Sequence, residues 1–100
     1  MRRAAKVDRN QAEVVAALRA AGATVEPMHA VGRGFPDLAV GFRGATFLIE
    51  VKDPSGSPSH RALTERQRDW HAAWRGQVAV VEDAQAALAV LGLVETGEAG

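Results

Sequence analysis

Gly34-Phe35-Pro36-Asp37-Leu38 and Phe47-Leu48-Ile49-Glu50-Val51-Lys52 are the two most informative segments of this sequence. The first places an aspartate directly after a proline turn. The second ends a strongly apolar run with a glutamate and a lysine two positions apart. Because charged side chains are costly to bury, their presence beside apolar runs indicates chemistry at this place in the fold.

The second segment is predicted to be a β-strand over residues 46–52, since it is short and rich in β-branched and aromatic residues. Side chains alternate across a strand, so Glu50 and Lys52 point to the same face. A preceding strand over 38–42 is joined to it by Arg43-Gly44-Ala45, which favours a tight hairpin. Such a hairpin would bring Asp37 close to Glu50 and Lys52.

These three charged groups suggest a metal-assisted reaction. Two converging carboxylates repel each other unless a cation lies between them, and hard oxygen ligands favour Mg²⁺, with Mn²⁺ as a substitute. Mg²⁺ keeps several waters and usually takes one or two carboxylates, which leaves room for a phosphate oxygen. A lysine beside it suits the attacking water or developing negative charge. The pattern predicts hydrolysis of a phosphodiester by Asp37, Glu50 and Lys52.

Pro36-Asp37 with Glu50-Val51-Lys52 resembles the PD-(D/E)xK nuclease signature. Gly34-Phe35-Pro36-Asp37-Leu38 with the downstream Thr64-Glu65-Arg66-Gln67 resembles its VRR-NUC branch, the virus-type replication-repair nuclease domain that also occurs as small phage proteins. The resemblance covers roughly residues 8–91. It implies a restriction-endonuclease-like core and a Mg²⁺-dependent DNA endonuclease that leaves 5′-phosphate and 3′-hydroxyl ends, with a homodimer acting on branched or junction DNA.

The same resemblance suggests further site residues. The carbonyl of Val51 would join Asp37 and Glu50 as a metal ligand. Related nucleases often place an acidic residue of the first helix near the metal, and Glu13 matches that third carboxylate. Asn10, one turn earlier on the same side, is the competing candidate, and a merely solvated glutamate is the plain alternative for Glu13.

Gln67 has two interpretations. Thr64 and Gln67 have the spacing of a capping box, which alone could explain the glutamine. The resemblance instead assigns it to orienting Lys52 or the attacking water. Gln67 falls in one helical stripe with Trp70 and Trp74, and we expect this stripe to face the sheet, with the tryptophans as core residues in preference to platforms for stacked bases.

Nucleic-acid contacts are expected from two loops. In Gly32-Arg33-Gly34 the glycines would allow close approach of the backbone to DNA, and Arg33 would meet a phosphate. His60 and Arg61 end a Pro/Ser/Gly-rich loop that leaves Lys52, and are either phosphate contacts or part of a passive linker. His29, near the first loop, is more often structural than catalytic in such a position.

Net charge is zero, but all 12 basic residues lie at or before Arg75 while four acidic residues follow it. Residues 1–81 are therefore net positive, which either creates a positive face for DNA or reflects ordinary scattered surface charge. There is no cysteine, so disulfides and cysteine-based zinc sites are excluded. No membrane span or signal peptide is visible, and we expect a cytoplasmic protein, of a bacterium or a phage-infected cell, without an organic cofactor.

The order of elements predicts an α/β fold: helix, three strands, helix, strand and a C-terminal helix, with a mixed four-stranded sheet flanked by helices. The expected organisation is a basic arm over 1–7, a single domain over 8–92 and an acidic tail over 93–100. Asp8 is predicted to cap the first helix, and the first strand to run over 24–30. The open alternatives to an enzyme are a non-catalytic nucleic-acid-binding subunit and a structural or interaction protein.

Overall fold

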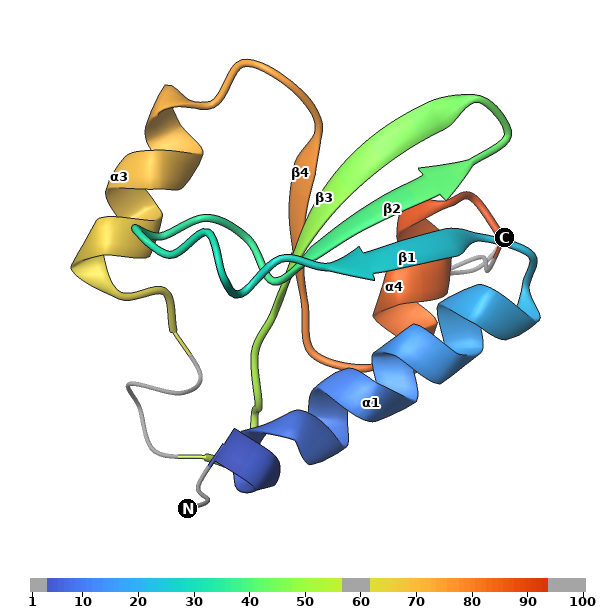
Figure 1. Ribbon diagram of the computed structural model, residues 1–100, viewed down its shortest axis with the longest axis horizontal. Helices are drawn as coiled ribbons and strands as arrows, with labels where there is room; N and C mark the ends of the chain where they lie inside the picture. The colour runs from blue at the N-terminus through green and yellow to red at the C-terminus, as the bar shows by residue number, and fades with distance from the viewer. Residues whose placement is uncertain (1–3, 57–61, 94–100) are drawn as a thin grey trace, which may run out of the picture.

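A four-stranded sheet forms the centre of the protein, as shown by a computed structural model that describes residues 4–56 and 62–93 (Figure 1). Its strands are β1 (Thr24–Pro27), β2 (Leu38–Phe42), β3 (Ala45–Val51) and β4 (Val78–Val81), in the spatial order β1-β2-β3-β4. The first two pairs are antiparallel, and β3 pairs with β4 in parallel. The predicted mixed sheet and its parallel crossover pair are confirmed.

The hairpin between β2 and β3 sets the register that the site depends on. Its turn is Arg43-Gly44, and both residues have positive φ, 53° and 81°, as a type I′ turn requires. A two-residue turn leaves no freedom in pairing, and Leu38 lies opposite Ile49. Asp37, which immediately precedes Leu38, is thereby fixed beside the end of β3.

Helices α1 (Ala4–Ala20) and α4 (Ala84–Val90) lie side by side over one face of the sheet (Figure 1). Between these helices and the sheet is the main core, built of small and branched apolar side chains: Val14, Leu18, Ala23, Val25, Leu38, Val40, Ile49, Val81, Ala87 and Leu91. Within the described residues, no helix is long and apolar enough to cross a membrane.

Two predicted boundaries are wrong. Helix α1 already begins at Ala4, so Asp8 lies inside the helix and is not its N-cap. The residues before Asp8 include alanine and lysine, which are strong helix formers, and they extend the helix toward the N-terminus. Strand β1 ends at Pro27: the N–H of Met28 makes a last cross-strand bond to the carbonyl of Asp37 at 2.8 Å, and a turn closed by Val31 N–H on the carbonyl of Met28 at 3.0 Å then takes the chain out of the sheet.

Helix α3 (Glu65–Ala73) lies on the opposite side of the sheet from α1 and α4 (Figure 1). It has no buried residue, so it is held to the sheet by a few specific contacts without a second core. The prediction that the stripe of this helix is core is therefore wrong for Trp74, which is 41% exposed, while Trp70 is half-buried against Phe35. A helix joined this way can be displaced without disturbing the main core.

Candidate active site

Asp37 and Glu50 meet at the end of the hairpin, as the sequence predicts. Asp37 Oδ2 accepts a hydrogen bond from the backbone N–H of Val51 at 2.8 Å, which ties the aspartate to the residue after Glu50. Asp37 is half-buried, and Glu50 is only 2% exposed. The hairpin thus places two carboxyl groups next to each other in a largely water-excluded position.

The environment of Glu50 is unfavourable for a negative charge. Burial, followed by the charge of Asp37, raises the pKa of Glu50 to about 8, and the nearby Lys52 offsets only part of this. The proton of the neutral acid is what allows two such carboxyl groups to lie together. A cation placed there would replace that proton.

Lys52 lies just after the last residue of β3, yet its backbone is firmly held. Its N–H donates to the carbonyl of Val81 at 2.9 Å, and its own carbonyl accepts from Asn10 Nδ2 at 2.8 Å. The side chain is buried, with Nζ 3.8 Å from Glu50 Oε2. The predicted shared face of Glu50 and Lys52 is confirmed.

Gln67 connects α3 to the group formed by Asp37, Glu50 and Lys52. It forms the predicted capping box and also contacts the site. The side-chain Oε1 of Gln67 accepts from the backbone N–H of Thr64 at 2.9 Å, and the backbone N–H of Gln67 donates to Thr64 Oγ1 at 3.1 Å. Together these two bonds complete a capping box. Its Nε2 then donates to Glu50 Oε2 at 2.9 Å. Because the cap takes the carbonyl oxygen, the amide nitrogen is directed at Glu50.

Gly34 fits α3 against the loop that carries Asp37. A Cβ atom built on Gly34 would lie 2.7 Å from the carbonyl oxygen of Arg66, and φ of Gly34 is +84°. The glycine is thus needed for close approach to the first turn of α3, a reason other than the expected approach to DNA. The preceding Arg33 is exposed, with a positive φ of 56°, and its contact with phosphate stays a prediction.

The first helix contributes Asn10 to the surroundings of the site. Besides the carbonyl of Lys52, Asn10 Nδ2 reaches the carbonyl of Glu82 at 3.1 Å, so it links α1 to the ends of β3 and β4. Glu13 is exposed on the same helix. Between the two candidates, the structure brings Asn10 to the site through its side chain, and a metal-binding role for Glu13 stays a prediction.

His71 was missed in the sequence. It lies one turn after Gln67 on α3, and burial, followed by the positive charge of Lys52, lowers the pKa of His71. Its Nε2 is buried and has no hydrogen-bond partner in the described part of the chain. The signal was its spacing of four residues from Gln67, which puts both side chains on one face of the helix.

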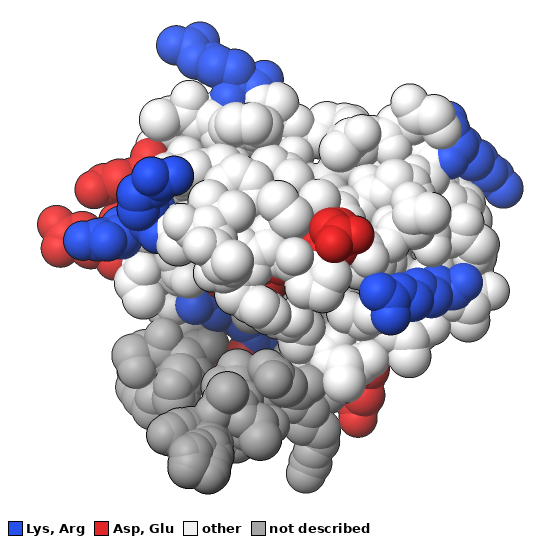
Figure 2. Space-filling model, viewed as in Figure 1, with Lys and Arg blue, Asp and Glu red and all other residues white. Residues whose placement is uncertain are grey.

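The remaining predicted contacts are placed as follows. His29 is exposed, and His60 and Arg61 lie outside the described residues. Figure 2 shows one face of the protein, on which basic side chains are scattered along the margins and stand beside acidic ones at the left. On this face the charges are dispersed, which fits ordinary scattered surface charge better than a positive face for DNA.

The carboxyl pair fits a divalent cation. Glu50 Oε1 is buried without a hydrogen-bond partner among the described residues, although Oε2 contacts Gln67 and Lys52. A buried oxygen without a donor is unusual in a folded protein. No group of three or more His, Asp or Glu side chains that could hold a metal is found within residues 4–56 and 62–93. Mg²⁺ usually takes only one or two protein carboxylates, so the pair of Asp37 and Glu50 fits it in number.

Comparison with known proteins agrees with this geometry. No protein-family profile and no curated protein matches the sequence. A solved structure described as a VRR_NUC domain has the same fold, with a TM-score of 0.63 and 28% sequence identity over 84% of this chain and 91% of the other. The two chains therefore correspond over most of their lengths in both fold and sequence. The chain therefore has the fold of a VRR_NUC domain and resembles that domain in sequence.

Proposed function

We propose that the protein is a metal-dependent DNA endonuclease that hydrolyses phosphodiester bonds and uses Asp37, Glu50 and Lys52 as its active-site residues. The observation that carries this proposal is the convergence of two carboxyl groups, one of them buried with a free oxygen, on a buried lysine. A purely structural role does not account for such a cluster, because two carboxyl groups brought together in a buried position destabilise a fold unless one of them keeps its proton. The arrangement matches the PD-(D/E)xK pattern of the sequence.

Asp37 and Glu50, with the carbonyl of Val51, would hold the metal. Mg²⁺ or Mn²⁺ at this place would supply a Lewis acid for a phosphate oxygen and lower the pKa of a water molecule. Glu50 presents its unpartnered Oε1, while Gln67 occupies Oε2 and so fixes the plane of the carboxylate. The bond from Val51 N–H holds Asp37 in the same way.

Lys52 would orient the attacking water and stabilise the negative charge that develops on the phosphate. Its backbone is held by both β4 and α1, so the ammonium group is presented from a rigid position. Burial increases the electrostatic effect of this charge relative to one in water. His71, whose pKa is lowered by its burial and by Lys52, adds no competing positive charge there at neutral pH.

The substrate would be branched or junction DNA, and the active form a homodimer. The family resemblance in the sequence supports both, as it does the 5′-phosphate and 3′-hydroxyl products. A single domain of 100 residues buries a modest share of its surface, and a second copy would add to its stability. Light scattering of the purified protein at two concentrations tests the dimer separately from the chemistry.

Cleavage of labelled DNA tests the proposed activity. The panel contains single-stranded, duplex, flap, splayed and four-way DNA, each with Mg²⁺, Mn²⁺ or EDTA, beside Asp37→Ala and Lys52→Ala proteins. We expect metal-dependent cutting that both substitutions abolish, with DNA binding by Lys52→Ala largely retained. Binding without cutting in every lane would favour a non-catalytic nucleic-acid-binding subunit, and cutting by Lys52→Ala would remove that residue from the mechanism.

A further inference from the structure

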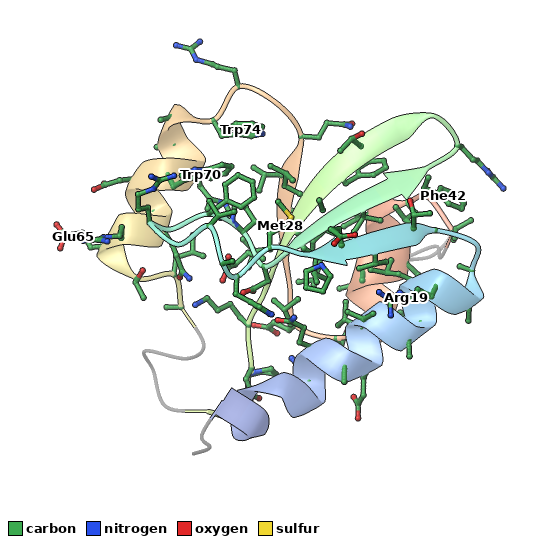
Figure 3. All side chains as sticks on the ribbon, in the orientation of Figure 1. Arg19, Met28, Phe42, Glu65, Trp70 and Trp74 are labelled. Carbon is green, nitrogen blue, oxygen red and sulfur yellow. The ribbon has the colours of Figure 1, made fainter. Side chains whose placement is uncertain are left out.

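An aromatic cluster lies next to the carboxyl pair and outside the core. Trp70 and Trp74 are stacked, with ring centroids 4.7 Å apart and planes at 18°, and Phe35 meets Trp70 edge to face at 5.1 Å. Figure 3 shows both tryptophans projecting from α3 on the side that faces the sheet. Trp74 is 41% exposed, although Gly76 lies against part of its indole, since a Cβ atom built on Gly76 would be 2.8 Å from Trp74 Nε1.

The cluster is continuous with the active site along two routes. Phe35 is two residues before Asp37 and joined to it through the buried Pro36. Trp70 is one turn of helix after Gln67, which holds Glu50. Val80 extends the same face from the sheet, since it pairs with Glu50 in β4 and is 46% exposed. A phosphate at the carboxyl pair would therefore have its attached nucleotides near these rings.

We propose that Trp74, supported by Trp70 and Phe35, is a stacking platform for an unpaired nucleobase beside the scissile phosphate. This proposal rests on the proposed function in taking DNA as the substrate, and it deepens it by requiring a single-stranded nucleotide at the cleavage point. Aromatic rings bind unpaired bases of any sequence, because each base offers a π-face, whereas a base inside a duplex has no free face.

A nucleotide suits this surface better than a second copy of the chain. Four basic residues are close to the rings in sequence: Arg66 and Arg68 on the same helix, Arg75 directly after Trp74, and Arg33 two residues before Phe35. Glu65 and Asp69 on α3 offset only part of this charge. Aromatic side chains in a segment with more basic than acidic residues are the composition by which proteins hold single-stranded nucleic acid.

Intrinsic fluorescence gives a direct test, because Trp70 and Trp74 are the only tryptophans in the chain. Asp37→Asn protein in EDTA serves as the binding form, since it cannot cut and the amide oxygen can still accept from Val51 N–H. It is titrated with splayed DNA, with the same DNA carrying an abasic site at each position of one unpaired arm in turn, and with blunt duplex. Quenching of fluorescence and Kd are both recorded.

Substitutions of Trp74 separate stacking from plain hydrophobic contact. Trp74→Phe keeps an aromatic face, Trp74→Leu keeps only apolar surface, and Leu93→Ala removes an exposed apolar side chain after α4, away from the site. We expect Trp74→Leu to weaken binding of splayed DNA roughly 10-fold or more, and Trp74→Phe and Leu93→Ala only slightly. With the protein that retains Trp74, an abasic site at one position of the arm should weaken binding by the same factor as Trp74→Leu does. With Trp74→Leu, that abasic site should have no further effect.

Several outcomes would overturn the platform. These are equal binding of the abasic series, retained affinity in Trp74→Leu, or a change in oligomeric state of Trp74→Leu without a change in DNA affinity, which would assign the surface to a second copy. Because this experiment measures binding without metal, it is independent of cleavage. If binding does not depend on the base but DNA is cleaved, the proposed nuclease activity is supported and the stacking platform is refuted. If binding depends on the base but DNA is not cleaved, the stacking platform is supported and the nuclease activity is refuted.

Discussion

At the scale of single residues, Gln67 does two jobs that the sequence shows as one. The spacing of Thr64 and Gln67 predicts the capping box, and the cap forms with both of its hydrogen bonds. The bond from Gln67 to Glu50 joins residues 17 positions apart, so no local pattern contains it. The sequence suggested Lys52 or a water as the partner of Gln67, and the structure shows the Glu50 carboxyl group.

Replacing Gln67 with Glu separates these two jobs. Glutamate keeps the acceptor of a capping box, so α3 should stay folded, but it replaces the donor to Glu50 by a third carboxylate. We expect at least a 10-fold loss of cleavage with unchanged helix content by circular dichroism. Thr64→Ala is the matched control that weakens the cap by about 1 kcal/mol and leaves the donor in place. Equal activity in Gln67→Glu and the unmodified protein would refute the role of this hydrogen bond.

Glu50 predicts a characteristic dependence of stability on pH. Its pKa is about 8 in the folded protein against 4.5 in the unfolded chain, so between these values only the unfolded state releases the proton. The free energy of unfolding therefore falls as pH rises from about 4.5 to 8, by up to a few kcal/mol at about 1.4 kcal/mol per pKa unit. Glu50→Gln removes the titration while keeping the shape of the side chain.

Urea denaturation in EDTA at pH 5, 6, 7 and 8 checks this expectation. Glu50→Gln should be nearly equal to the unmodified protein at pH 5 and more stable at pH 8, although it should have lost cleavage. Asp83→Asn is a useful control, because Asp83 is the exposed N-cap of α4 and its replacement keeps a capping side chain. Parallel curves for Glu50→Gln and the unmodified protein would show that Glu50 is not neutral in the folded state.

At the scale of elements, the hairpin and α3 are positioned in different ways. The hairpin is fixed by local sequence, since Arg43-Gly44 gives a two-residue turn and the register follows from it. Helix α3 is positioned by contacts across the chain, among them the close approach of Gly34 to the backbone of Arg66 and the hydrogen bond from Gln67 to Glu50. The sequence could show that Gly34 permits unusual backbone angles, but not what its missing side chain makes room for.

Gly34 and Gly32 therefore respond differently to substitution by Ala. Both have positive φ, +84° and +71°, so each substitution carries a backbone cost of about 1–2 kcal/mol. Only at Gly34 does the new Cβ meet α3, and it would push away the helix that carries Gln67. We expect Gly34→Ala to lose most of its cleavage activity, and Gly32→Ala, with nothing within 4 Å, to keep it at temperatures where both are folded. Similar activity in the two variants would contradict this account of α3.

At the scale of the whole molecule, the sequence predicts the fold well and the surroundings of the site less well. The order of strands and helices follows from local patterns, and the pairing of Asp37 with Glu50 follows from the hairpin. The position of α3 depends on long-range contacts and not on an apolar stripe packed in a core, so the exposure of Trp74 was not predictable. The start of α1 before Asp8 was missed because a capping pattern outweighed the helix propensity of the residues before it.

One domain carries both a stable core and a destabilised site. The core lies between α1, α4 and the sheet, while the carboxyl pair lies on the side toward α3, where no helix residue is buried. A cation bound there would relieve the repulsion between Asp37 and Glu50 and replace the proton of Glu50. Metal binding should therefore release protons at neutral pH. The number of protons released per metal ion depends on both the raised pKa of Glu50 and the position of the metal between the two carboxyl groups.

Calorimetric titration of Mn²⁺ into the protein at pH 7, in two buffers of different ionisation enthalpy, measures that quantity. The account predicts saturable binding with the release of nearly one proton per ion by the unmodified protein. Glu50→Gln should release none, and Asp37→Asn should bind far more weakly. Absence of binding, or binding that neither substitution alters, would contradict a metal centre formed by Asp37 and Glu50.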